Sequence, residues 1–132
     1  MAGLTEAQRA FIRDNAYYGI VTTLRADGSP HSTVVWVDEE DGKILVNTAY
    51  PRAKTQHLDR DPRASVTVVD PNDAYRWIAV SGPVELATEG ANADIDRLSY
   101  KYDGHEFRSH REGETRVSVL LAPERVKAVG IE

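Results

Sequence analysis

Hydrophobic and polar residues alternate over short stretches of the chain, in the pattern that favours strands. Residues 17–25 (YYGIVTTLR) are rich in β-branched and aromatic side chains, and the turn sequence ADGS separates them from 31–38 (HSTVVWVD). A second turn, EEDG, leads into 43–48 (KILVNT). The pattern predicts three antiparallel strands joined by short connections.

The same pattern returns later in the chain. Residues 63–70 (RASVTVVD) and 75–82 (YRWIAVSG) flank the turn PND and predict another hairpin. Gly82-Pro83 predicts a bulge or bend before the strand VELAT. Two more strand-like segments, TRVSVLLA and RVKAVG, lie at 115–122 and 125–130.

Helical spacing appears in three places. The sequence TEAQ has the spacing of a capping box and predicts a helix that ends near Asn15. Residues 52–59 and 91–102 predict two further helices, the second with apolar residues on one face. The polar segment 103–114 (DGHEFRSHREGE) is long enough to form a lid or a mobile connection.

These elements predict a single domain over residues 1–132, mostly β with flanking helices. Six or seven short strands, with few and short helices, favour a small antiparallel barrel with helices at its ends. A chain of 132 residues can bury one core, and two domains of typical size would need more.

Composition narrows the chemistry. Without cysteine, the chain has no disulfide and no thiolate, so redox chemistry needs a bound organic cofactor. A net charge of -5 argues against a nucleic-acid partner. No apolar run approaches the ~18 residues of a transmembrane helix, and the amino end lacks a signal-peptide pattern. We therefore expect no membrane insertion and a cytoplasmic location.

The segment 50–65 (YPRAKTQHLDRDPRAS) is basic on an acidic background. Arg52 and Lys54 stand where a predicted strand passes into a helix, and the N–H groups of a helix amino end favour an anion. Side chains two apart on a regular helix diverge by about 200°, so both reach one phosphate only from an irregular first turn.

A second interpretation of this segment remains open. Arg60 and Arg63 stand beside Asp59 and Asp61, and such neighbours form solvated surface pairs that contribute about 0–1 kcal/mol each. On this interpretation the segment is a charged helix start without a ligand.

Two other chemistries are disfavoured by spacing. His31, next to Ser32 and near Asp27, suggests a hydrolase triad, but adjacent residues of a strand point to opposite faces. His105 and His110 stand five residues apart in a polar segment, which is not a usual spacing of metal ligands. We expect no metal site.

Several motifs in order carry a family resemblance. The segments GIVTTLRADGSPHSTVVWV, ILVNTAYPRAKTQHLDRDPRASVTVVD and YRWIAVSGPVEL resemble the pyridoxamine 5'-phosphate oxidase-like family. TTLRADGSPH and PRAK-x3-L-x2-DPRAS are similar to its actinobacterial branch, which uses the deazaflavin coenzyme F420. The likeness is close over residues 16–86 and looser elsewhere, and it implies a six- to seven-stranded antiparallel split β-barrel of the FMN-binding type.

The resemblance also implies a site. The family's phosphate-binding Arg and Lys fall on Arg52 and Lys54, and the strand that faces the flavin ring falls on residues 32–36. The neighbours implied at the phosphate are Asn47, Thr48, Pro51, Ala53 and Thr55, and those along the ring are Ser32, Val34 and Trp36. Arg76 and Trp77 resemble positions that approach the cofactor from a second subunit.

The cofactor determines what else the site needs. FMN ends in a phosphate monoester, whereas coenzyme F420 continues into a lactyl-oligoglutamate tail that needs a basic track. Arg60 and Arg63 supply such a track if they line the groove. The residues that bind the substrate phosphate in true pyridoxamine phosphate oxidases have no counterpart in RVKAVGIE, which argues against vitamin B6 oxidation.

The resemblance implies a homodimer with the cofactor groove at the subunit interface. The implied reaction is hydride transfer from reduced coenzyme F420 to a conjugated small molecule such as an enone, a quinone or a tetrapyrrole. Solvent, Tyr75 or a histidine of the 103–114 segment would supply the companion proton. The alternatives are an FMN-binding oxidoreductase of the same fold and a non-catalytic carrier of coenzyme F420.

Overall fold

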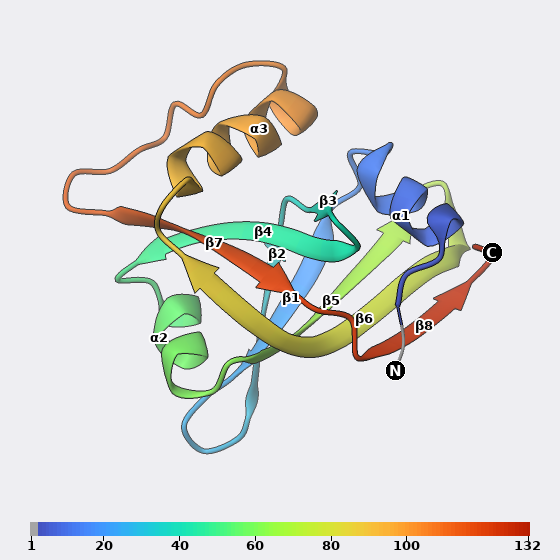
Figure 1. The fold of residues 1–132 in the computed structure, drawn as a ribbon, viewed down its shortest axis with the longest axis horizontal. Helices are drawn as coiled ribbons and strands as arrows, with labels where there is room; N and C mark the ends of the chain where they lie inside the picture. The colour runs from blue at the N-terminus through green and yellow to red at the C-terminus, as the bar shows by residue number, and fades with distance from the viewer. Residues whose placement is uncertain (1–2) are drawn as a thin grey trace.

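The computed structural model describes residues 3–132, and over them a curved antiparallel sheet is flanked by three helices (Figure 1). The strands are β1 (Gly19–Leu24), β2 (Pro30–Val35), β3 (Asp38–Glu40), β4 (Lys43–Tyr50), β5 (Arg63–Asp70), β6 (Asp73–Ala87), β7 (Thr115–Leu121) and β8 (Arg125–Val129). The helices are α1 (Glu6–Arg13), α2 (Ala53–Arg60) and α3 (Ala91–Asp103). The three predicted helices and the mostly β architecture are confirmed.

The sheet follows the order β2-β1-β5-β6-β7-β4-β3, with β8 paired to β6 off this path. Its two terminal strands, β2 and β3, do not pair with each other, so the barrel stays open between them. An open seam of this kind is the split of a split barrel, and it leaves one edge of β2 without a strand partner among residues 3–132.

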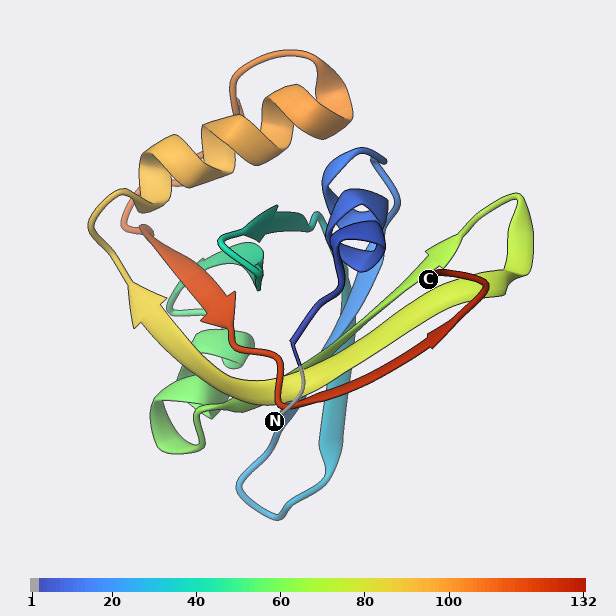
Figure 2. The same cartoon turned by 45° about the vertical axis from the view of Figure 1, so that its right-hand side comes forward.

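Strand β6 connects the two halves of the sheet. Its first part pairs with β5 and β8, and its second part pairs with β7. The change of partner falls at Gly82 and Pro83, where the strand curves without interruption (Figure 2). A β-carbon at Gly82 would collide with the carbonyl oxygen of Ala122, so this crossing needs glycine.

The structure has one more strand than the six or seven expected. The extra strand, β3, covers Asp38, the last residue of the predicted strand 31–38, and the first two residues of the predicted turn EEDG. The carboxylates of Asp38 and Glu39 are buried because basic side chains of two helices neutralise them: Arg9 of α1 lies 3.0 Å from Glu39, and Arg97 of α3 lies 3.0 Å from Asp38.

The core lies between the concave sheet and the helices. Phe11 and Ile12 are the buried residues of α1, whose N-cap Thr5 forms the predicted capping box with Gln8. Ile95 and Leu98 are buried on α3. None of the helices in residues 3–132 is both long and apolar enough to cross a membrane.

Candidate functional site

The amino end of α2 presents two basic side chains from an irregular start. Arg52 is the N-cap residue, with extended backbone (φ -69°, ψ 156°), and Lys54 lies in the first turn. Thr55 fixes this turn, because its hydroxyl donates to the carbonyls of Ala49 (3.0 Å) and Arg52 (2.7 Å). The irregular first turn that one shared phosphate requires is therefore present.

A hollow of about 320 Å³ lies beside this helix end, at the open seam of the barrel. Side chains from both halves of the sheet, from α3 and from the segment after α3 line it. They are Tyr18, Val34, Val35, Trp36, Asn47, Arg52, Lys54, Ile95, Leu98, Phe107, Ser109 and Arg116. The structure thus brings together five of the predicted residues, Val34, Trp36, Asn47, Arg52 and Lys54.

Lys54 is a half-buried cation without a carboxylate partner among the described residues. Its Nζ donates to the hydroxyl of Thr33 at 2.8 Å, which ties α2 to β2. Burial lowers the pKa of Lys54, and the positive charges of Arg52 and Arg116 lower it further. Both effects disfavour the ammonium form, and an anion in the hollow would oppose them.

Arg116 of β7 is a site residue that the sequence prediction missed. Its side chain is 4% exposed, its Nε donates to Asn47 Oδ1 at 3.0 Å, and its guanidinium lies 4.9 Å from the ring centre of Phe107. Burial lowers the pKa of Arg116. The sequence does contain one signal for Arg116: it stands in TRVSVLL, a strand with four apolar residues, and a charge in a largely apolar strand needs a partner.

Glu114 is the one carboxylate that pairs with these cations among residues 3–132. It lies 3.4 Å from Arg116 and 3.9 Å from Arg52, and its side chain is 8% exposed. Burial raises the pKa of Glu114, but a backbone hydrogen bond from Arg111 and the charges of Arg116 and Arg52 more than offset this, so its pKa is lowered. Three cations against one carboxylate leave the site electropositive.

Aromatic side chains form a further part of the wall. The ring of Trp36 stacks on Tyr102, with centroids 5.5 Å apart and planes at 15°. Phe107, from the segment after α3, meets Trp36 edge to face at 6.3 Å. The hollow is therefore lined by both cationic and aromatic side chains, which meet where Arg116 contacts Phe107.

The other predicted neighbours lie outside the hollow. Thr48 and Thr55 are buried in the interior, and Ser32 bonds to Thr22 at 2.8 Å. Pro51 and Ala53 are exposed at the start of α2. Their predicted contacts with a cofactor stay predictions.

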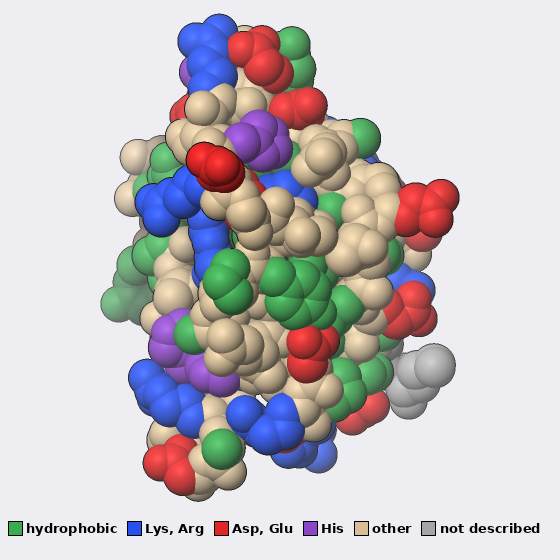
Figure 3. All heavy atoms as spheres, turned by 90° about the vertical axis from the view of Figure 1, so that its left-hand side faces the viewer, with side chains coloured by type: hydrophobic (Ala, Val, Ile, Leu, Met, Phe, Trp, Pro, Cys, Tyr) green, Lys and Arg blue, Asp and Glu red, His purple; other side chains and the backbone are tan. Residues whose placement is uncertain are grey.

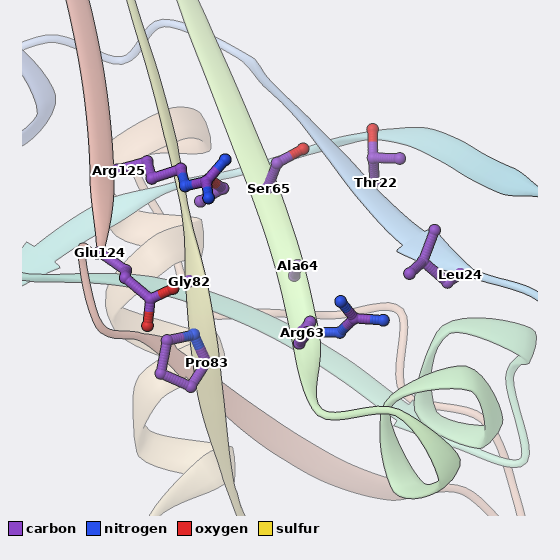
Figure 4. Close-up of a pocket in the computed structure, with 10 residues that line it drawn as sticks. Thr22, Leu24, Arg63, Ala64, Ser65, Gly82, Pro83, Glu124 and Arg125 are labelled. Atoms are coloured by element: carbon purple, nitrogen blue, oxygen red, sulfur yellow. The ribbon is translucent and has the colours of Figure 1, made fainter. Parts of the chain in front are cut away.

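Arg60 and Arg63 do not point to a common groove. Arg60 donates to the carbonyl of Leu24, whereas Arg63 forms an exposed ion pair with Asp61 at 2.8 Å, as the surface-pair interpretation proposes. Arg63 also lines a second, shallow hollow of about 450 Å³ on the outer sheet face, with Arg125 of β8 on its other side (Figure 4). Both arginines are exposed there, so this hollow lacks the buried charge of the first.

The residues predicted to act from a second subunit lie elsewhere in this chain. Arg76 pairs with Asp70 at 2.9 Å and covers the ring of Phe11 at 4.7 Å. Trp77 lies in the β6 ladder. Tyr75, the tyrosine suggested as a proton donor, is 82% exposed. None of the three lines the hollow. The approach of Arg76 and Trp77 to a partner's cofactor stays a prediction, and so does the role of Tyr75.

The disfavoured chemistries find no support in the geometry. Ser32 bonds to Thr22, while the ring of His31 packs edge to face on His57 at 5.1 Å. Within residues 3–132, no three His, Cys, Asp or Glu side chains are grouped as they would be around a metal ion.

Known proteins share this architecture. The model of the family described as pyridoxamine 5'-phosphate oxidase matches residues 4–130. An F420H(2)-dependent biliverdin reductase from Mycobacterium tuberculosis is 27% identical over 126 residues, which are 93% of this chain and 86% of that protein.

Solved structures agree with the fold. An F420 reductase superposes with a TM-score of 0.79 at 24% identity, over 89% of this chain and 94% of its own. A conserved hypothetical protein from Mycobacterium tuberculosis superposes with a TM-score of 0.76 at 24% identity, over 96% of this chain and 84% of its own. At this identity the superpositions establish the shared split barrel.

Proposed function

The chain belongs to the pyridoxamine 5'-phosphate oxidase family, and from that premise we propose that it is a coenzyme F420-dependent reductase of a conjugated small molecule. The similarity to an F420H(2)-dependent biliverdin reductase supports an F420-dependent activity. It also favours an extended conjugated acceptor, such as a tetrapyrrole, an enone or a quinone.

The observation that carries the proposal is the excess positive charge in the hollow. Arg52, Lys54 and Arg116 converge there with Glu114 as their one paired carboxylate among the described residues. The buried guanidinium of Arg116 offers a planar fork and Lys54 a point charge, which together suit a phosphate. These residues fit the phosphate of coenzyme F420, and equally that of FMN.

The remaining residues would orient the ring and exclude water. The unpaired edge of β2 offers backbone N–H and C=O groups beside Val34 and Trp36. Phe107 and Ser109 cover the hollow from the 103–114 segment. When bound, reduced coenzyme F420 supplies the hydride, so the chain's tasks are binding, orientation and exclusion of water.

His110 and Tyr75 differ in how they could deliver the companion proton. His110 contacts a residue that lines the hollow, because its ring lies 4.8 Å from that of Phe107, and its Nδ1 lies 3.5 Å from Glu114. Tyr75 projects into solvent from β6 of this chain. The geometry favours His110 or solvent over Tyr75.

A second copy of the chain completes the proposed site. The outer face of β2, β1 and β5 carries exposed apolar side chains, among them Tyr18, Ile20, Val34 and Val69. Ile20 lies opposite Val34 in the ladder, so the patch is continuous, and Val34 belongs to both the patch and the hollow. A homodimer through this face would bury the patch and place the cofactor groove between subunits.

The test is a single-turnover assay. Reduced coenzyme F420 bound to the protein is mixed with biliverdin, a quinone and an enone, and the return of the oxidised cofactor's absorbance is followed. Reoxidation that depends on acceptor and protein supports the proposal. Tight binding without reoxidation across the panel would favour the carrier. Reduction of the same acceptors by the protein loaded with reduced FMN, and not with reduced coenzyme F420, would favour the flavoenzyme.

A further inference from the structure

A second group of basic side chains lies at the hairpin end of the seam between β2 and α2. Arg25 comes from the turn after β1, His31 from β2, and His57 and Arg60 from the last turn of α2. Figure 3 shows histidine and Lys or Arg side chains side by side on one face of the molecule. No ion pair to any of these four residues is present among residues 3–132, although the chain as a whole is acidic.

Two consecutive rungs of the β1–β2 ladder hold the group together. On the first rung Thr23 faces His31, and the Thr23 hydroxyl lies 2.9 Å from His57 Nδ1 while the two imidazole rings are 5.1 Å apart. On the next rung Leu24 faces Pro30.

That rung fixes the two arginines. Arg60 donates to the carbonyl of Leu24, and Arg25 donates to the carbonyl of Pro30 at 2.6 Å. Both guanidinium groups are exposed and retain further N–H donors for a ligand.

The group continues the row of cations that starts in the hollow. Lys54, His57 and Arg60 are spaced three residues apart along α2, with a rise of about 4.5 Å per step. Each of them contacts the β1–β2 hairpin: Lys54 bonds to Thr33, His57 contacts Thr23 and His31, and Arg60 bonds to Leu24.

We propose that Arg25, His31, His57 and Arg60 form a second anion site, which binds a carboxylate or phosphate group and takes up a proton at the histidine pair on binding. The proposal rests on the proposed function only in one respect: the row places this second anion beyond the one at Lys54. The oligoglutamate tail of coenzyme F420 and a free phosphate are both of the right chemistry.

The charges around the histidines give the coupling its sign. Burial lowers the pKa of His57, and the charges of His31, Arg60 and Arg25 lower it further. An anion beside these groups opposes that repulsion, so the bound form holds the proton more firmly. Binding at this site is therefore stronger at lower pH.

The neighbouring carboxylates are engaged elsewhere. Asp27 of the hairpin turn accepts from the backbone N–H and hydroxyl of Ser29 (2.9 and 2.6 Å). Asp61, at the end of α2, accepts two hydrogen bonds from Arg63, each of 2.8 Å. Asp59 accepts from the hydroxyl of Tyr50 at 2.8 Å.

The test is an NMR titration of the histidine imidazoles of the full chain with pH, with and without sodium pyrophosphate. We expect pyrophosphate to raise the titration midpoint of His57 by about 0.5 pH unit or more. His105, in the exposed segment after α3, serves as the internal control and should not move. An equal shift of the midpoints of His57 and His105, or no shift of His57, would overturn the proposal.

Two variants locate the effect. Arg60→Gln should raise the midpoint of His57 without ligand, because a nearby charge is removed, and should remove most of the pyrophosphate-induced shift. Arg108→Gln, a matched change in the segment after α3, should alter neither the ligand-free midpoint of His57 nor its shift with pyrophosphate. A full pyrophosphate shift retained in Arg60→Gln contradicts the assigned site.

Coenzyme F420 with and without its glutamate tail identifies the source of the anion. A shift of His57 by the tailed form alone assigns the site to the tail, and a shift by pyrophosphate alone assigns it to a free anion. If neither form of the coenzyme binds, the proposed function is refuted. The pyrophosphate titration would still decide whether the second site exists.

Discussion

Lys54 shows how a single residue links stability and binding. Its ammonium group is partly buried, bonded to Thr33 and repelled by two arginines, so the free protein carries a cost that a bound anion would reduce. A site of this kind is more stable when it holds its ligand.

The lowered pKa of Lys54 makes stability depend on pH. The unfolded chain holds the lysine proton up to about pH 10.5, whereas the folded chain releases it at lower pH. Between these two values the unfolded state binds more protons, so the free energy of unfolding should rise with pH. Urea unfolding of the native protein and Lys54→Met at several alkaline pH values checks this. In Lys54→Met the free energy of unfolding should rise less steeply with pH. The rise that remains is due to Lys101, whose pKa is also lowered by burial.

Arg116 should be sensitive even to a change that keeps its charge. Arg116→Lys removes the planar fork, the contact with Phe107 and the geometry of the bond to Asn47. We expect affinity for coenzyme F420 to fall about tenfold or more, equivalent to about 1.4 kcal/mol. Isothermal titration measures it, with Arg125→Lys on the outer sheet face as control. Equal affinity of both variants would show that Arg116 makes no specific contact.

Arg52 and Lys54 could be predicted from the sequence because both stand in one contiguous motif. Arg116 lies more than sixty residues away on β7, and only strand pairing brings it beside Asn47 of β4. Local sequence carries no information on that pairing. The exposed Arg60 and Arg63 looked equivalent in the sequence, but the last turn of α2 packs beside β1 and lets Arg60 bond to Leu24, whereas Arg63 starts β5 and pairs with Asp61.

Among the elements, β6 determines the shape of the barrel. The sequence predicted its two halves and the bend between them, because Gly-Pro is a recognisable interruption. It did not predict that one continuous strand would pair with β5, β8 and β7. Strand β3 was missed because its burial depends on cations from α1 and α3.

Gly82→Ala tests the role of this crossing. The new methyl group would overlap the carbonyl oxygen of Ala122 and lie 3.1 Å from Glu124 atoms, so the backbone of β6 or of the β7–β8 connection must move. We expect a loss of about 1–3 kcal/mol in the free energy of unfolding. Chemical denaturation checks it against Gly3→Ala, where no atom lies within 4 Å of the added carbon. Equal stability of the two variants would mean that the crossing tolerates a side chain.

On the scale of the whole molecule, the open seam and the apolar outer face belong together. The hollow is open where the exposed patch begins, and Val34 is common to both. Closing the seam by association would therefore complete the site and cover the patch at once.

Charges placed on this face should separate the subunits. Ile20 and Val69 are 39% and 42% exposed on β1 and β5, and lysine at both positions would leave two buried cations at the proposed interface. Sedimentation should show a dimer for the native protein and a monomer for Ile20→Lys/Val69→Lys. Tyr100→Lys, at an apolar position on α3 that is 57% exposed, should stay dimeric. A monomeric native protein would refute the dimer.

The measurement that tests the central claim most directly is a pair of equilibrium titrations, with coenzyme F420 and with FMN, on the native protein, Arg52→Ala and Lys54→Ala. We predict micromolar or tighter binding of coenzyme F420, weaker binding of FMN, and a loss of about 1.5–3 kcal/mol in each variant. Unchanged affinity in both variants, or no binding of either cofactor by the native protein, would contradict the assignment of the hollow as a phosphate site.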